Sequence, residues 1–141
     1  MSFHYSNRTL HVEEVPIMQI MAKFGSPCYI YSQAILQRQW STFKQLLPHS
    51  QQICYAVKAN SNLTILARLA KWGAGFDIVS GGELARVQQA GGDLKKTVFS
   101  GVGKTCDEIK TALLANVGCF NVESQSELLR IEDIAKKLQK E

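Results

Sequence analysis

The stretch ICYAVKANSNLTILARLAKWGAGFDIVSGGEL, residues 53–84, holds two short apolar runs on either side of a helical pattern. The runs cover residues 53–57 and 76–79 and are rich in β-branched and aromatic side chains, which is typical of buried strands. Between them, apolar residues recur at the spacing of a helix with one buried face, namely Leu63, Leu66, Ala67 and Ala70. This order predicts a strand, a helix and a second strand that joins the first in a parallel sheet.

The same pattern continues toward the C-terminus. Further apolar runs cover residues 98–102 and 119–122, so the starts of the four runs lie 23, 22 and 21 residues apart. Two more helices are predicted, each opening with a capping box, Thr105 with Glu108 and Ser124 with Glu127. Their apolar stripes are Ile109, Ala112, Leu113 and Asn116 in the first, and Leu128, Ile131, Ala135 and Leu138 in the second. Residues 51–141 are therefore expected to form about four βα units.

Residues 1–50 form a preface with a different pattern. A helix is predicted to follow Pro16 and to end at Gly25. An extended strand is expected at residues 27–31, and a second helix carries Leu36, Trp40, Phe43 and Leu47 on one face. Since no linker rich in Pro, Gly or Ser separates this helix–strand–helix preface from the repeats, residues 1–141 are expected to form one folded unit.

Composition excludes several classes of function. The chain has 141 residues, 45% of them hydrophobic, and its net charge of +4 is scattered without a basic block, which argues against nucleic acid as a partner. No apolar run is long enough to span a membrane and no signal sequence is evident, so we expect a cytoplasmic protein. The four cysteines are spaced too widely for a metal or redox motif, and we expect reduced, mostly buried thiols and no metal.

Candidate site residues come from the carboxyl ends of the predicted strands, because those ends meet on one face of a parallel sheet. They are Lys58, Asp77, Ser80, Ser100 and Glu123. Lys58 is either a solvated surface amine or an amine partly removed from water, which could form a Schiff base with an aldehyde. The GKT of residues 103–105 resembles the end of a phosphate-binding loop, but that loop needs glycine where this chain has Val98, so the interpretation is rejected.

Four phrases in order resemble the bacterial diaminopimelate decarboxylases: YAVKANSN at 55–62, GFDIVSGGEL at 75–84, VFSGVGKT at 98–105 and CFNVESQSEL at 119–128. Ornithine and arginine decarboxylases and alanine racemase share the strand-end lysine more loosely. The resemblance implies an α/β fold in which this chain is the first half of a (β/α)8 TIM-type barrel. It also implies a C-terminal half-barrel and a β-rich domain outside residues 1–141, and a homodimer.

The same resemblance implies the chemistry. Lys58 would hold pyridoxal 5′-phosphate covalently, Asp77 would lie in the cofactor pocket, and Glu83 would lie close by. Taken singly, Asp77 and Glu83 could equally be a helix-dipole carboxylate and a solvated side chain. The implied reaction is decarboxylation of meso-diaminopimelate to L-lysine, a lyase reaction of amino-acid biosynthesis.

Other readings stay open at this stage. The family's ring-stacking histidine, phosphate loop and substrate-binding residues are expected beyond residue 141, so the chain is expected to be inactive alone unless a complementary C-terminal fragment supplies them. One alternative is a related ornithine or arginine decarboxylase or an amino-acid racemase. A different class is a non-catalytic half-barrel that serves for binding or assembly, because a half-barrel leaves open sheet edges.

Overall fold

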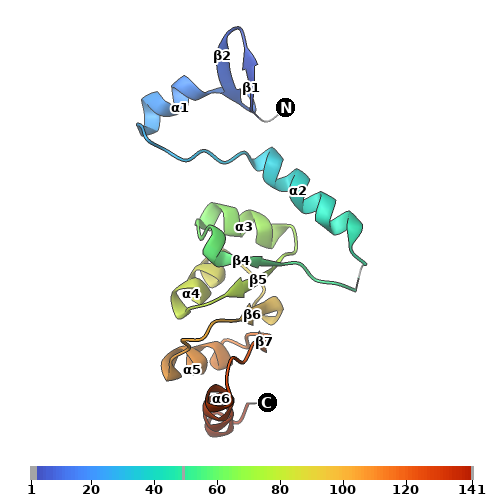
Figure 1. Ribbon diagram of the computed structural model, residues 1–141, viewed down its shortest axis with the longest axis vertical. Helices are drawn as coiled ribbons and strands as arrows, with labels where there is room; N and C mark the ends of the chain where they lie inside the picture. The colour runs from blue at the N-terminus through green and yellow to red at the C-terminus, as the bar shows by residue number, and fades with distance from the viewer. Residues whose placement is uncertain (1–2, 49, 141) are drawn as a thin grey trace. The chain divides into compact units, whose positions relative to one another are not determined.

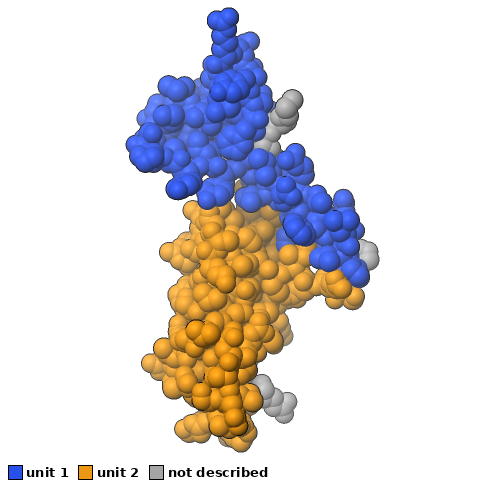
Figure 2. All heavy atoms as spheres, in the orientation of Figure 1, with its two compact units in different colours: residues 1–49 blue, residues 50–141 orange. Residues whose placement is uncertain are grey.

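A computed structural model describes residues 3–48 and 50–140. The chain divides into two compact units, residues 1–49 and 50–141, shown in different colours in Figure 2. The boundary falls where the sequence separates the preface from the repeats. That both units belong to one folded domain stays a prediction.

The first unit opens with a small antiparallel sheet that the sequence analysis did not predict. Its strands are β1 (Phe3–Ser6), β2 (Thr9–Val12) and β3 (Val15–Pro16). Asn7 and Arg8, both with positive φ, form the two-residue turn between β1 and β2. That turn type is usually signalled by glycine, and the arginine at this position hides it in the sequence.

Two helices complete the first unit: α1 (Ile17–Phe24), which ends at Gly25, and α2 (Gln33–Leu46). The expected strand at residues 27–31 is not formed, because no described segment pairs with it. Glu13, in the turn after β2, reaches α2 instead. Its Oε1 accepts hydrogen bonds from the Ser32 hydroxyl at 2.7 Å and from the Ala34 N–H at 2.9 Å.

The second unit contains the parallel sheet that the spacing of the apolar runs predicted. Its strands are β4 (Cys54–Ala56), β5 (Gly75–Ile78), β6 (Thr97–Phe99) and β7 (Cys119–Phe120), hydrogen-bonded in that order. Each is followed by a helix: α3 (Leu63–Lys71), α4 (Gly81–Gln89), α5 (Cys106–Leu114) and α6 (Gln125–Lys137). Short 3₁₀ turns lie at Val57–Ala59 (η1) and Leu94–Lys96 (η2). Figure 1 shows the strands and helices following one another from green to red. The sheet is open in the described residues, so closure into a barrel stays a prediction.

Burial alternates along the central strands. Phe76, Ile78 and Phe99 are fully buried, and each contributes about 1.5–3 kcal/mol of hydrophobic free energy. Asp77 and Val98, which are registered with each other on β5 and β6, are only half-buried. Since successive side chains of a strand point to opposite faces, one face of the sheet carries the core and the other is left open.

One of the two predicted capping boxes forms in full, and the buried faces differ from the predicted stripes in places. At the start of α6 the Ser124 hydroxyl accepts from the Glu127 N–H, but the Glu127 carboxylate binds Lys104 and does not complete the box. Thr105 and Glu108 form the expected capping box at α5. In α3, Ala67 is exposed and Ile65 and Leu69 are buried in its place. In α6, Leu128 is 51% exposed, whereas the adjacent Glu127 is buried and binds Lys104.

The cysteine prediction is wrong with respect to burial. Cys28, Cys106 and Cys119 are exposed and Cys54 is half-buried, so none is a core thiol. Cys119 lies on β7, the last strand of the sheet, where no further described strand covers it. No helix among the described residues is long and apolar enough to cross a membrane.

Candidate functional site

The open face of the second unit gathers the strand-end residues. Ala56 of β4 is registered with Asp77 of β5, and Lys58 follows two residues later in η1. The turn is held by Val57, which is fully buried, and by the Tyr55 hydroxyl, which donates to the Asn60 carbonyl at 3.2 Å. A fixed backbone therefore carries Lys58 at the carboxyl end of the first strand of the sheet.

The Lys58 side chain itself is exposed and makes no hydrogen bond or ion pair with any residue of the described second unit, 50–140. Its amine is thus available for reaction with a ligand. The sequence analysis considered a Lys58 amine partly removed from water, but Lys58 is exposed among the described residues.

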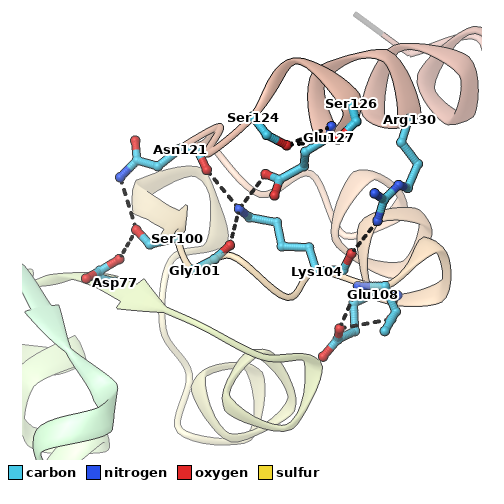
Figure 3. Close-up of polar contacts among 11 residues, drawn as sticks. Asp77, Ser100, Gly101, Lys104, Glu108, Asn121, Ser124, Ser126, Glu127 and Arg130 are labelled. Atoms are coloured by element: carbon cyan, nitrogen blue, oxygen red, sulfur yellow. Dashed lines mark hydrogen bonds and ion pairs between the residues drawn. The ribbon is translucent and has the colours of Figure 1, made fainter.

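A chain of hydrogen bonds joins three strand ends on this face. The Ser100 hydroxyl donates to Asp77 Oδ1 at 2.5 Å, and Asn121 Nδ2 donates to the Ser100 hydroxyl at 3.0 Å (Figure 3). Asp77 belongs to β5, while Ser100 and Asn121 directly follow β6 and β7. The structure therefore brings together two predicted site residues, Asp77 and Ser100, with a third that was not predicted. Asn121 lies 21 residues after Ser100, which is the repeat spacing, so the period of the sequence could have revealed it.

A second cluster lies beside the first, at the base of the next two loops. Lys104 is 2% exposed and its Nζ donates to the Gly101 carbonyl at 2.7 Å, the Asn121 carbonyl at 2.8 Å and Glu127 Oε1 at 2.7 Å (Figure 3). An ammonium group has three donor hydrogens, and all three are used. Lys104 is thus a structural residue that ties the loop after β6 to the loop after β7 and to α6.

The remaining predicted residues have local partners. The Ser80 hydroxyl accepts from the Glu83 N–H at 3.2 Å and so caps α4, while Glu83 Oε2 accepts from the Val79 N–H at 2.7 Å and holds the turn before the helix. Glu123 is exposed and does not join the cluster.

Glu108 links two neighbouring helix starts. Its Oε1 accepts from the Gly81 N–H at 2.7 Å, at the start of α4, while its Oε2 accepts from Thr105 at the start of α5. These hydrogen bonds, that from Gly81 above all, lower the pKa of Glu108 below its ordinary value. Because the Gly81 N–H at the start of α4 donates to Glu108, it is not available to bind an external anion.

The described residues contain no cluster of three or more His, Cys, Asp and Glu side chains that could hold a metal ion. The open face offers an exposed, unengaged amine in the turn after β4 and an oriented carboxylate on the neighbouring strand β5. This places the chain in the class of α/β proteins that present their functional groups at the carboxyl ends of parallel strands.

The chain belongs to the family described as "Pyridoxal-dependent decarboxylase, pyridoxal binding domain", whose sequence pattern matches residues 33–140. It is 53% identical over 130 residues to the diaminopimelate decarboxylase of Vibrio cholerae, covering 92% of this chain and 31% of that protein. It is 49% identical to that of Haemophilus influenzae, covering 98% and 34%. The crystal structure of diaminopimelate decarboxylase from M. jannaschii with L-lysine superposes with a TM-score of 0.90 at 34% identity, covering 98% of this chain and 33% of that one. The chain thus spans about a third of the length of these relatives.

The residues present fit the group that the family name implies. Covalent attachment of pyridoxal phosphate needs a lysine amine that is not engaged elsewhere. Lys58 meets this condition, whereas Lys104 has all of its donors in buried contacts. Asp77 adds a carboxylate on the neighbouring strand, with one oxygen engaged by Ser100.

Proposed function

We propose that this chain is the pyridoxal-phosphate-binding part of a diaminopimelate decarboxylase, with Lys58 as the residue of covalent attachment. The observation that carries the proposal is the contrast between two lysines in the loops that follow strands: the Lys58 amine after β4 is exposed and unengaged, and the Lys104 amine after β6 is buried and fully bonded. When bound, pyridoxal phosphate supplies an aldehyde for the lysine and an electron sink for cleavage at the substrate α-carbon.

The protein's own residues would position that group. Lys58 would hold pyridoxal phosphate at the carboxyl end of β4. Asp77, which is registered with Ala56 on the adjacent strand, would offer that group a hydrogen-bond acceptor. Glu83 lies at the start of the following helix and acts through the backbone, by holding the Val79 N–H and so the turn that leaves β5. We place Glu83 near the pocket for that reason, and not in contact with the reacting atoms.

The substrate proposed is meso-diaminopimelate, which loses one carboxyl group as carbon dioxide and gains a proton in its place to give L-lysine. This chain is identical at about half of its aligned residues to proteins named diaminopimelate decarboxylase, and this similarity supports diaminopimelate over another amino acid as the substrate. We further propose that the complete enzyme works in the cytoplasm as a homodimer with a (β/α)8 barrel. Where the chain is not joined to a second half-barrel, a complementary C-terminal polypeptide would supply it.

The assignment of Lys58 is tested by borohydride reduction of the chain loaded with pyridoxal phosphate, followed by peptide mass mapping. We expect the phosphopyridoxyl mass on Lys58, loss of labelling in Lys58→Ala, and unchanged labelling in Lys71→Ala, whose lysine is exposed on α3. Label found on Lys71 or Lys104 would refute the assignment.

The substrate is tested genetically, in a strain deleted for the locus that encodes this chain. We expect growth to require lysine, and growth without lysine to return when the locus is restored but not when it carries Lys58→Ala. A deletion strain that grows without lysine would exclude this substrate and favour a related decarboxylase or racemase.

A further inference from the structure

We infer that Ser100 and Asn121 are positioning residues that set the orientation of the Asp77 carboxylate on the open face of the sheet. The inference rests on the proposed function, since it gives these residues a role toward the group bound at Lys58. It starts from the relay in Figure 3, in which Asn121 donates to Ser100 and Ser100 donates to Asp77.

The direction of the relay is fixed by its chemistry. A serine hydroxyl has a single hydrogen, and an ionised carboxylate can only accept. Because Asn121 Nδ2 donates to the Ser100 oxygen, the Ser100 hydrogen is directed at Asp77 Oδ1. Hydrogen bonds to an ionised acceptor are short and strong, and the 2.5 Å separation of Ser100 Oγ and Asp77 Oδ1 agrees with that.

Both relay residues stand on backbone that cannot move easily. The Ser100 N–H donates to the Ile78 carbonyl at 2.8 Å and the Asn121 N–H donates to the Phe99 carbonyl at 3.0 Å, so the parallel ladder extends past the strand ends. The Asn121 carbonyl is held in turn by the buried Lys104 ammonium at 2.8 Å. The buried ion pair between Lys104 and Glu127 therefore helps to fix the backbone that carries Asn121.

The arrangement leaves one carboxylate oxygen for a ligand. Asp77 Oδ1 is engaged by Ser100, whereas Oδ2 makes no hydrogen bond with any residue of the described second unit. When one oxygen of a carboxylate is held by a hydrogen bond, the other oxygen is an acceptor of fixed orientation. A hydrogen-bond donor of the bound group can therefore be met by Oδ2 without reorganisation.

The relay itself is tested without any ligand, by NMR of the Asn121 side-chain amide in the ¹⁵N-labelled chain. We expect Asp77→Asn to shift this signal, because the change passes through Ser100, and the shift to vanish in the Ser100→Ala background. Ser50→Ala, an exposed serine at the start of the second unit, is the matched control and should have no effect. An Asn121 signal that ignores Asp77→Asn would overturn the inference.

The role toward the ligand is tested by titration of the same variants with pyridoxal phosphate, followed in the visible absorbance and circular dichroism of the bound group. We expect Ser100→Ala to weaken binding by about tenfold to a hundredfold, the range of one hydrogen bond to a charged group. Asn121→Asp should act in the same direction, because a second carboxylate competes for the Ser100 hydrogen. Ser100→Thr keeps the hydroxyl and should retain both binding and the circular dichroism, and Ser50→Ala should not differ from the unaltered chain.

The outcomes separate this inference from the proposed function. Normal labelling at Lys58 with unchanged binding and dichroism in Ser100→Ala and Asn121→Asp would overturn the positioning role and leave the function standing. Absence of any labelling at Lys58, both in the unaltered chain and in that chain supplied with the complementary C-terminal polypeptide, would remove the proposed function and the role toward that group together. The amide signal would then still decide whether the relay orients Asp77.

Discussion

Replacement of Lys104 by methionine should cost the second unit a large share of its stability. The Lys104 and Glu127 side chains are 0% and 4% exposed, and their charged atoms lie 2.7 Å apart. Methionine is close to lysine in length but cannot donate, so it leaves the Glu127 carboxylate buried without its ion-pair partner and removes the lysine's hydrogen bonds to the partly buried Gly101 and Asn121 carbonyls. Breaking one partner of a buried ion pair costs about 3–5 kcal/mol, against a total of about 5–15 kcal/mol for a typical domain.

The measurement is urea unfolding followed by tryptophan fluorescence. The chain has two tryptophans, Trp40 in the first unit and Trp72 in the second, so Trp40→Phe provides a background in which fluorescence reports only on the second unit. The matched control is Lys136→Met, which breaks a pair of similar length, 2.6 Å, with Glu132 on the exposed side of α6. Because both of those side chains are at least half exposed to water, we expect little change in the control.

A double variant distinguishes a buried charge from a general packing defect. Lys104→Met with Glu127→Leu removes both charges, so it should recover a large part of the stability that Lys104→Met loses. The reasoning is refuted if Lys104→Met lowers the free energy of unfolding by less than about 1 kcal/mol, the range of exposed pairs. It is also refuted if the double variant is as unstable as the sum of the two single ones.

Three further predictions concern single contacts. The hydrogen bond from the Gly81 N–H, above all, holds the pKa of Glu108 below its ordinary value. The free energy that Glu108 contributes to folding is therefore fully present above its ordinary pKa and is lost as pH falls through the lowered pKa. Glu108→Gln should make the stability of the second unit depend less on pH in acid. The Ala34 N–H at the start of α2 likewise lowers the pKa of Glu13, so the first unit should lose stability as pH falls through that lowered pKa. Glu13→Gln should remove the dependence in a thermal melt followed by Trp40 fluorescence in a Trp72→Phe background. A Cβ on Gly118 would lie 2.0 Å from a backbone oxygen, whereas one on Gly103 would meet nothing within 4 Å, so Gly118→Ala should cost more than about 1 kcal/mol in urea unfolding and Gly103→Ala should not.

Much of the second unit follows from the sequence because its signals are local or periodic. Apolar runs that start 23, 22 and 21 residues apart predict four parallel strands in chain order, and the structure has them. The Thr105 and Glu108 capping box is a contact between residues three apart, so it too can be read directly. In the first unit the hairpin was missed, because its turn lacks glycine.

Other features were decided only when the repeats packed together. Lys104 and Glu127 are 23 residues apart, as are Asp77 and Ser100, so each pair joins adjacent βα units. A charged residue in a glycine-rich turn carries no local sign that it will be buried, because burial depends on what the next repeat places against it. By itself the sequence determined the strand order, the helix starts and the positions of Lys58 and Asp77. The tertiary structure alone decided which lysine is free and which is locked, since only packing brings together the carbonyls and the carboxylate that engage Lys104.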